Sequence, residues 1–132
     1  MIYLLDTHIL IWSLLYSSKL SDNCLEILKN KKNTILVSAI SFWEISLKHS
    51  LNKLEILGLM PDVFPELAIK AGYELLPLLP NEVANYHHLK ATWHKDPFDR
   101  MLIWQAIQNN ITLISKDETI NKYQSAGLKV VW

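Results

Sequence analysis

The chain has 132 residues, of which half are hydrophobic and a fifth are charged, a composition typical of one globular domain and not of a disordered chain. Its 13 basic and 13 acidic residues cancel, so overall charge gives no support for nucleic-acid binding, which would need a local patch. The lone Cys24 excludes an internal disulfide and a cysteine-based metal knuckle, and the three glycines form no phosphate-binding glycine-rich loop.

The same features predict the compartment and the number of domains. Residues 1–3 carry no basic segment, and the apolar run over 9–15 is short and interrupted by Ser13, so we expect no signal peptide and no membrane span. A single cysteine fits a reducing compartment. We therefore expect a cytoplasmic protein with a single domain over residues 1–132.

The first part of the chain predicts strands that alternate with helices. Residues 2–5 are an apolar run ending in Asp6, which is typical of a parallel strand buried on both faces. A helix over 9–15 follows, and Ser21 opens another. Residues 35–37 then form the second strand.

Glu44 has two interpretations. Ser41 and Glu44 match the S-x-x-E capping box, in which the glutamate bonds the backbone at the helix start, and spacing alone favours this structural role. Glu44 also lies in the first turn of a helix that leaves the carboxyl end of a strand, where a functional site could use it.

The middle of the chain predicts a helix over 66–73, a strand over 75–79 and a helix over 81–93. Pro77 cannot donate to a sheet ladder, which favours an edge position for that strand. Three histidines, at positions 87, 88 and 94, fall on the last helix or just after it. Because adjacent helical residues point about 100° apart, we expect surface or packing roles for them.

The next helix starts with capping residues that are also acidic. Asp96 fits the N-cap, Pro97 fits the first helical position, and Asp99 falls in the first turn, where the helix dipole favours negative charge. A strand over 112–115 follows, and Asp117 comes directly after it. Taken singly, each of these acids is explained by capping or turn chemistry.

The alternation of elements, closed by a strand over 128–132, predicts an α/β fold with a mainly parallel central sheet of four to five strands and helices on both faces. Ligands bind such sheets beyond the carboxyl ends of the strands. Asp6, Glu44 and Asp117 can each reach that edge. Asp99 can do so if the segment before it crosses over the edge.

Four carboxylates in one pocket require a counter-charge, because like charges raise one another's pKa. Oxygen ligands favour a hard cation such as Mg²⁺ or Mn²⁺. Such an ion can activate water and stabilise the oxyanions of an in-line phosphoryl displacement. The sequence therefore predicts phosphodiester hydrolysis.

Four segments in this order resemble PIN-domain proteins, specifically the VapC-type toxins of bacterial toxin–antitoxin pairs. They are LLDTHILIW at 4–12, SAISFWEI at 38–45, DPFDRMLI at 96–103 with Gln105 and Ala106 after it, and LISKD at 113–117. The resemblance covers nearly the whole chain and implies a three-layer PIN-like fold.

The resemblance also implies a magnesium-dependent endoribonuclease, with Mn²⁺ as an alternative ion. The acids that would bind the metal and carry catalysis are Asp6, Glu44, Asp99 and Asp117. The supporting residues beside them are Thr7, Arg100 and Ser115, with Ser115 in place of the family's usual threonine.

With zero net charge, RNA binding requires a local basic rim. The candidates for it are Lys48, Lys53, Arg100, Lys116 and Lys122. The resemblance makes transfer RNA the leading candidate for the substrate.

The five tryptophans are many for a chain that cannot bury every large side chain. We expect an exposed apolar patch drawn from the helices over 9–30 and 42–58, which would mark an interface. The candidates for its edge are Trp12, Trp43, Ile45 and Leu47. The resemblance implies a homodimer and a small antitoxin protein, often with a basic side chain that reaches the acids.

Other functions remain open beside the toxin. The same fold could serve as an RNA-processing nuclease without a toxin role, or as a catalytically weak module that mainly binds partners. A haloacid-type phosphohydrolase would need D-x-D after the first strand, where this chain has Asp6, Thr7 and His8.

Overall fold

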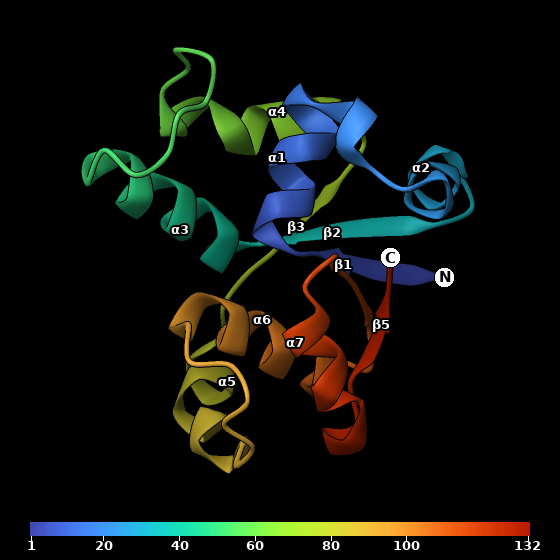
Figure 1. Ribbon diagram of the computed structural model, residues 1–132, viewed down its shortest axis with the longest axis vertical. Helices are drawn as coiled ribbons and strands as arrows, with labels where there is room; N and C mark the ends of the chain where they lie inside the picture. Colours follow the sequence, from blue (N-terminus) through green and yellow to red (C-terminus); the bar gives the residue numbers. More distant parts are fainter.

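Short apolar strands separated by helices form a wholly parallel five-stranded sheet in the order β3-β2-β1-β4-β5, which confirms the predicted fold class (Figure 1). The computed structural model describes residues 1–132. The strands are β1 (Ile2–Leu5), β2 (Thr34–Ser38), β3 (Glu74–Leu76), β4 (Thr112–Ile114) and β5 (Lys129–Val131). The strand predicted over 75–79 forms as β3, which ends at Leu76, just before Pro77, and the expected edge position is confirmed.

Helices cover both faces of the sheet, with α1 to α4 on one side and α5 to α7 on the other (Figure 1). They are α1 (Thr7–Leu15), α2 (Asp22–Lys29), α3 (Ala39–Ser50), α4 (Phe64–Lys70), α5 (Pro80–Ala84), α6 (Pro97–Gln108) and α7 (Glu118–Asn121). Four short 3₁₀ segments accompany them, at Ser17–Lys19, Pro61–Val63, Asn85–His88 and Lys122–Ala126. None of the helices combines the length and apolar character that crossing a bilayer requires.

The central strand β1 divides the core into two clusters. It pairs with β2 through Tyr3 and Ile35 and with β4 through Leu4 and Leu113. Leu5 packs in the cluster below α1 and α4, whereas Leu4 packs against the α6 side. Because successive strand residues point to opposite faces, both layers of helices are fixed to β1, and its carboxyl end is held rigidly between them.

The start of α3 differs from the prediction. Ser38, not Ser41, is the N-cap, and its hydroxyl accepts a hydrogen bond from the Ile40 backbone N–H at 3.1 Å. Ser41 is instead buried inside the helix, where its hydroxyl accepts from Thr7 at 3.0 Å. Glu44 therefore lies in the second turn, and the capping-box interpretation of this residue is wrong.

The helix predicted over 81–93 forms only in its first part. The chain forms the short α5 and a 3₁₀ turn and then runs without regular structure over 89–96. The guanidinium of Arg100 bonds the carbonyls of this segment, those of Leu89 at 2.9 Å and Ala91 at 2.5 Å. These carbonyls accept hydrogen bonds from the Arg100 side chain instead of from backbone N–H groups of a helix. The segment is therefore not helical, and it crosses over the carboxyl edge of the sheet towards α6.

Candidate metal centre

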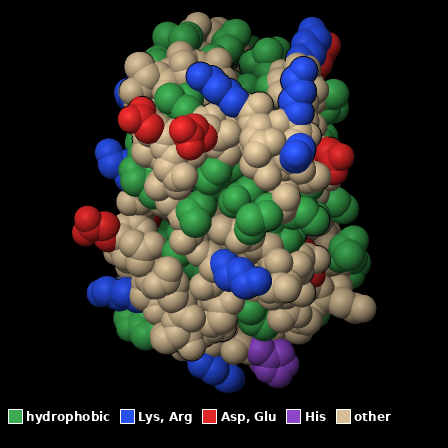
Figure 2. Space-filling view, turned by 90° about the vertical axis from the view of Figure 1, so that its right-hand side faces the viewer, with side chains coloured by type: hydrophobic (Ala, Val, Ile, Leu, Met, Phe, Trp, Pro, Cys, Tyr) green, Lys and Arg blue, Asp and Glu red, His purple; other side chains and the backbone are tan.

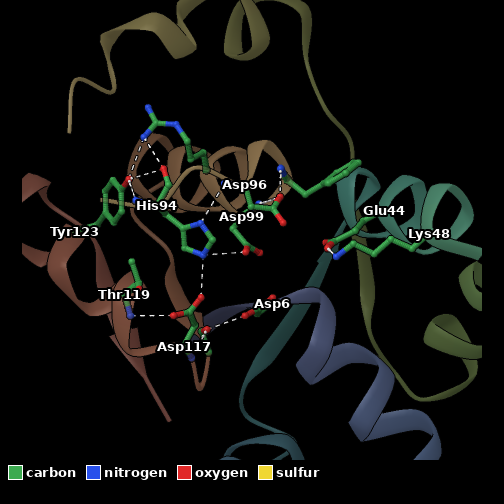
Figure 3. Close-up of polar contacts among 12 residues, drawn as sticks. Asp6, Glu44, Lys48, His94, Asp96, Asp99, Asp117, Thr119 and Tyr123 are labelled. Atoms are coloured by element: carbon green, nitrogen blue, oxygen red, sulfur yellow. Dashed lines mark hydrogen bonds and ion pairs between the residues drawn. The ribbon is translucent and has the colours of Figure 1, made fainter. Parts of the chain in front are cut away.

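Four acids from four elements face one region at the carboxyl edge of the sheet (Figure 3). Asp6 follows β1 and Asp117 follows β4, each at the N-cap position of the next helix. Asp99 lies in the first turn of α6 and Glu44 in the second turn of α3. Asp6, Asp99 and Asp117 line an open pocket of about 380 Å³.

Asp6 is buried with one oxygen bonded and the other free. Its Oδ2 accepts from the Ser115 hydroxyl at 2.7 Å, and its Oδ1 has no hydrogen-bond partner. Burial raises the pKa of Asp6 above its ordinary value, against the opposing effects of Ser115 and His8. A buried carboxylate oxygen without a donor needs a compensating partner.

Glu44 repeats this arrangement on α3. Its Oε2 is bonded by Lys48 one turn later, and its buried Oε1 has no partner. Partial burial alone would lower the pKa of Lys48, but the hydrogen bond and charge of Glu44 raise it overall. Lys48 is thus held on an acid of the site rather than extended into solvent.

Asp99 is half enclosed and lies among the charges of the other acids. Burial first, and then the charges of Asp6, Asp96, Glu44 and Asp117, raise its pKa to about 8. Asp96 itself is a cap, accepting from the backbone N–H groups of Phe98 at 2.8 Å and Asp99 at 3.4 Å. The metal-free site therefore keeps Asp99 mostly protonated at neutral pH.

His94 lies inside the site, contrary to the surface or packing role expected for it. Its Nε2 is 2.8 Å from Asp117 Oδ2 and 3.1 Å from Asp99 Oδ2. Its Nδ1 accepts from the backbone N–H of Asp96 at 3.2 Å, which assigns the proton to Nε2. His94 is therefore a donor to both acids, and no spacing in the sequence indicated this.

Asp117 has both oxygens engaged. Oδ2 faces His94, and Oδ1 accepts from the Thr119 backbone N–H at 2.8 Å. Burial alone would raise the pKa of Asp117, but the hydrogen bonds from His94 and from Thr119 lower it overall. The protein itself therefore stabilises the ionised form of Asp117.

Arg100 points away from the acids. Its guanidinium donates to the Tyr86 hydroxyl at 2.5 Å and to the Tyr123 hydroxyl at 2.9 Å, in addition to the carbonyls of residues 89 and 91. The side chain is almost fully buried. Arg100 was expected to contact RNA, but its guanidinium is buried and cannot do so. The side chain instead holds the segment that carries His94.

Of the other residues expected at the site, some lie beside the acids and others lie away from them. Ser115 bonds Asp6 and also accepts from the Asp117 backbone N–H at 3.1 Å, while Thr7 bonds Ser41 between α1 and α3. Lys116 lines the acid pocket. Lys53 lines a separate hollow at the end of α3, and Lys122 is exposed on the 3₁₀ segment after α7.

The donor set fits a hard divalent cation. Asp6 Oδ1 and Glu44 Oε1 are buried oxygens without partners. Asp99 and Asp117 offer carboxylate oxygens within 4.8 Å of each other and of His94, a group that does not include Asp6 or Glu44. Carboxylate oxygens are the ligands that Mg²⁺ and Mn²⁺ prefer. A bound cation would also remove the repulsion that keeps Asp99 protonated.

Comparison with known proteins gives a family and a fold. The family model described as PIN domain matches residues 3–125. No curated protein matches the chain significantly.

Solved structures share the whole fold at low sequence identity. VapBC2 from Rickettsia felis, bound to a DNA fragment from its promoter, has a chain that is 20% identical, with 99% of this chain and 98% of that chain covered and a TM-score of 0.67. DNA-bound VapBC from Salmonella typhimurium gives 14% identity, coverages of 99% and 97% and a TM-score of 0.68. A chain of FitAcB from Neisseria gonorrhoeae is 21% identical, with 100% of this chain and 97% of that chain covered and a TM-score of 0.61.

Proposed function

Because the chain belongs to the PIN domain family, we propose that it is a metal-dependent endoribonuclease and the toxin of a type II toxin–antitoxin pair. PIN domains are generally nucleases. The observation that carries the proposal is that Asp6 and Glu44 each have a buried oxygen without a hydrogen-bond partner. Such oxygens are costly in a folded protein unless a ligand uses them. The charges of these two acids also raise the pKa of Asp99.

Asp6, Glu44 and Asp99 would hold the ion, and Asp117 would complete the site. Mg²⁺ suits the oxygen donors, with Mn²⁺ as the alternative ion. When bound, such an ion supplies an activated water and stabilises the oxyanions of phosphodiester hydrolysis.

The protein's own groups orient these acids. Ser115 fixes Asp6 through a 2.7 Å hydrogen bond, Lys48 balances the charge of Glu44, and His94 joins Asp99 to Asp117. Each contact occupies one oxygen of an acid. For Asp6 and Glu44 the contact leaves the second oxygen for a ligand.

RNA is the proposed substrate, with transfer RNA as the leading candidate from the family resemblance. Figure 2 shows the side of the molecule on which the N-terminus lies, away from the acids, and there basic side chains are scattered among apolar and acidic ones. At the acids themselves Lys116 lines the pocket, and we propose that phosphate binding depends on the cation and on this lysine. Lys53 and Lys122 would lie further along the RNA, whereas Lys48 is held on Glu44.

The partner surface we propose is apolar and lies beside α3. Trp43 is 60% exposed and lines a hollow of about 220 Å³ with Val83, Tyr86 and Met101. Of the other expected edge residues, Ile45 is fully buried, Leu47 is half-buried, and Trp12 faces the acid pocket. The VapBC structures support an antitoxin as a partner, and we propose that one of its segments occupies the hollow.

A homodimer is the second proposed assembly. Sedimentation of the isolated protein at micromolar concentration tests it, and a single monomeric species would contradict it.

A neighbouring small protein that co-purifies and suppresses cleavage would support the toxin role. If no such protein binds, an RNA-processing nuclease becomes the better description.

Metal titration separates the enzyme from a catalytically weak partner-binding module. Mg²⁺ or Mn²⁺ added to metal-stripped protein should raise its unfolding midpoint, because the ion binds only the folded state. Asp6→Asn and Asp99→Asn should each remove this stabilisation, whereas Asp62→Asn, in an exposed 3₁₀ segment, should keep it. A midpoint that no divalent ion changes would favour the module.

A further inference from the structure

The pocket that holds the acids has a second half of different chemistry. Asp6, Asp99 and Asp117 line one part, and His8, Trp12 and Lys116 line the rest of the same 380 Å³ space. The metal site uses only the acidic half. Two aromatic rings and a cation therefore adjoin the place where hydrolysis is proposed, and none of them is among the proposed metal ligands.

The two rings come from one face of α1. His8 and Trp12 are one helical turn apart, with ring centroids 6.1 Å apart and planes at 47°. Trp12 packs partly against the core cluster under α1, and its ring meets that of Trp132 edge-on at 6.2 Å. Trp12 is thus fixed by packing on one side and lines the pocket on the other. Lys19 Nζ also lies over this ring, 5.7 Å from its centroid.

The cation comes from the loop between β4 and α7. Lys116 Nζ lies 5.7 Å from the ring centroid of Trp12 and 6.0 Å from that of Trp132. It forms no ion pair, although Asp117 is its neighbour in sequence. A lysine held only by cation–π contacts of this kind is weakly fixed, so its ammonium can move to a phosphate while the ring accepts another flat group.

We propose that His8, Trp12 and Lys116 form a subsite for an unpaired nucleotide next to the scissile phosphate. The base stacks on the Trp12 ring, His8 borders it, and Lys116 bonds the adjoining phosphate. This inference rests on the proposed ribonuclease function and specifies its substrate: a single-stranded or looped RNA segment. A paired base has both faces covered by its neighbours, and only an unpaired base can be turned onto an aromatic ring.

Binding of short RNA hairpins in Ca²⁺, which occupies oxygen sites without supporting magnesium-type hydrolysis, tests the subsite. The probes are one hairpin with an unpaired loop and a series of copies that lack one loop base each. For the wild-type protein, removing one particular base should weaken binding roughly five- to a hundredfold, the effect of losing one base–aromatic stack. In Trp12→Leu the intact hairpin should bind more weakly by a similar factor, and removal of that base should then have no further effect.

Two further variants complete the test. Trp12→Phe should keep part of the effect of base removal, and it carries the test if Trp12→Leu does not fold. Lys116→Gln should reduce the slope of log affinity against log salt by about 0.7, the value for one single-strand phosphate contact. Lys32→Gln, an exposed lysine before β2 at the opposite edge of the sheet, should leave the slope unchanged.

The outcomes are distinct. An equal loss on base removal in wild-type protein, Trp12→Leu and Trp12→Phe would overturn the subsite while leaving the ribonuclease proposal intact. Tighter binding of a fully paired duplex than of the looped hairpin would also overturn it. A wild-type protein that binds no RNA in any divalent ion would overturn the proposed function and the subsite together.

Discussion

At the scale of single residues, the site is a set of carboxylates that the protein stabilises unequally. Asp117 has hydrogen bonds to both oxygens and a lowered pKa, whereas Asp99 lies among like charges and has a pKa of about 8. A divalent cation removes this inequality by neutralising the charges that act on Asp99.

The acids themselves could be predicted from the sequence because each follows a recognisable strand or cap. His94 could not, because its role depends on a crossing segment that no local pattern encodes.

The pKa of Asp99 predicts how stability depends on pH. Its folded value of about 8 lies above the ordinary 3.8, so the folded protein keeps a proton that the unfolded chain releases between these values. The stabilisation is complete below the lower value and is lost as the pH rises through the higher one. Asp6 also has a raised pKa and acts in the same direction.

We therefore expect the unfolding midpoint of the metal-free protein to fall by roughly 5 °C or more between about pH 5 and pH 9. Asp99→Asn should flatten this decline, and saturating Mg²⁺ should flatten it in the wild-type protein. Calorimetry across the range measures both. Identical declines for wild-type protein and Asp99→Asn would show that the acid does not carry the effect.

His94 should act as a positioning residue through its Nε2–H group. In His94→Leu, the donor to Asp99 and Asp117 is lost, and both Mn²⁺ affinity and cleavage should fall roughly 10- to 100-fold, as for other partners of metal ligands. His94→Gln can still donate an N–H and should retain more of both. Mn²⁺ affinity followed by electron paramagnetic resonance, without RNA, distinguishes this role from a structural one. Wild-type affinity in His94→Leu would contradict it.

At the scale of elements, local patterns predicted the strands and the start of α6, because apolar runs and the Asp96-Pro97 pair are self-contained signals. They failed at the start of α3 and over residues 89–96. Ser38 caps α3 in place of Ser41, and Arg100 bonds carbonyls 9 and 11 residues earlier in the chain, which turns a predicted helix into a crossing segment. That segment is also what brings His94 over the carboxyl edge of the sheet.

Arg100 should therefore control the segment over 89–96 without touching the acids. Arg100→Lys cannot reproduce the planar set of donors, so the free energy of unfolding should fall by about 2 kcal/mol through lost buried hydrogen bonds. Amide exchange over 89–96 should accelerate, and cleavage should fall about tenfold because His94 is no longer held. Lys90→Gln, an exposed change in the same segment, is the control and should alter neither. Unchanged exchange in Arg100→Lys would refute this role.

At the scale of the whole molecule, topology explains why four acids distant in sequence meet. Parallel strands place all their carboxyl ends at one edge, so Asp6, Asp117 and the start of α3 were predictable neighbours. Asp99 joins them through the crossing segment, whose path the sequence permitted but did not specify. Because the net charge is zero, binding of RNA or of a partner protein must depend on local features. These are the acid pocket, Lys116 in its lining, and the apolar hollow beside Trp43.

Cleavage of structured RNA by metal-stripped protein, free of any partner, tests the central claim most directly. The expected result is no cleavage until Mg²⁺ or Mn²⁺ is added, products that carry a 5′-phosphate because water attacks in line, and loss of at least about a hundredfold in rate for Asp6→Asn and Asp99→Asn. Both variants should remain folded, because Asn is also accepted near a helix N-terminus. Equal cleavage in excess EDTA, or full activity in either variant, would contradict a metal-dependent ribonuclease built on these acids.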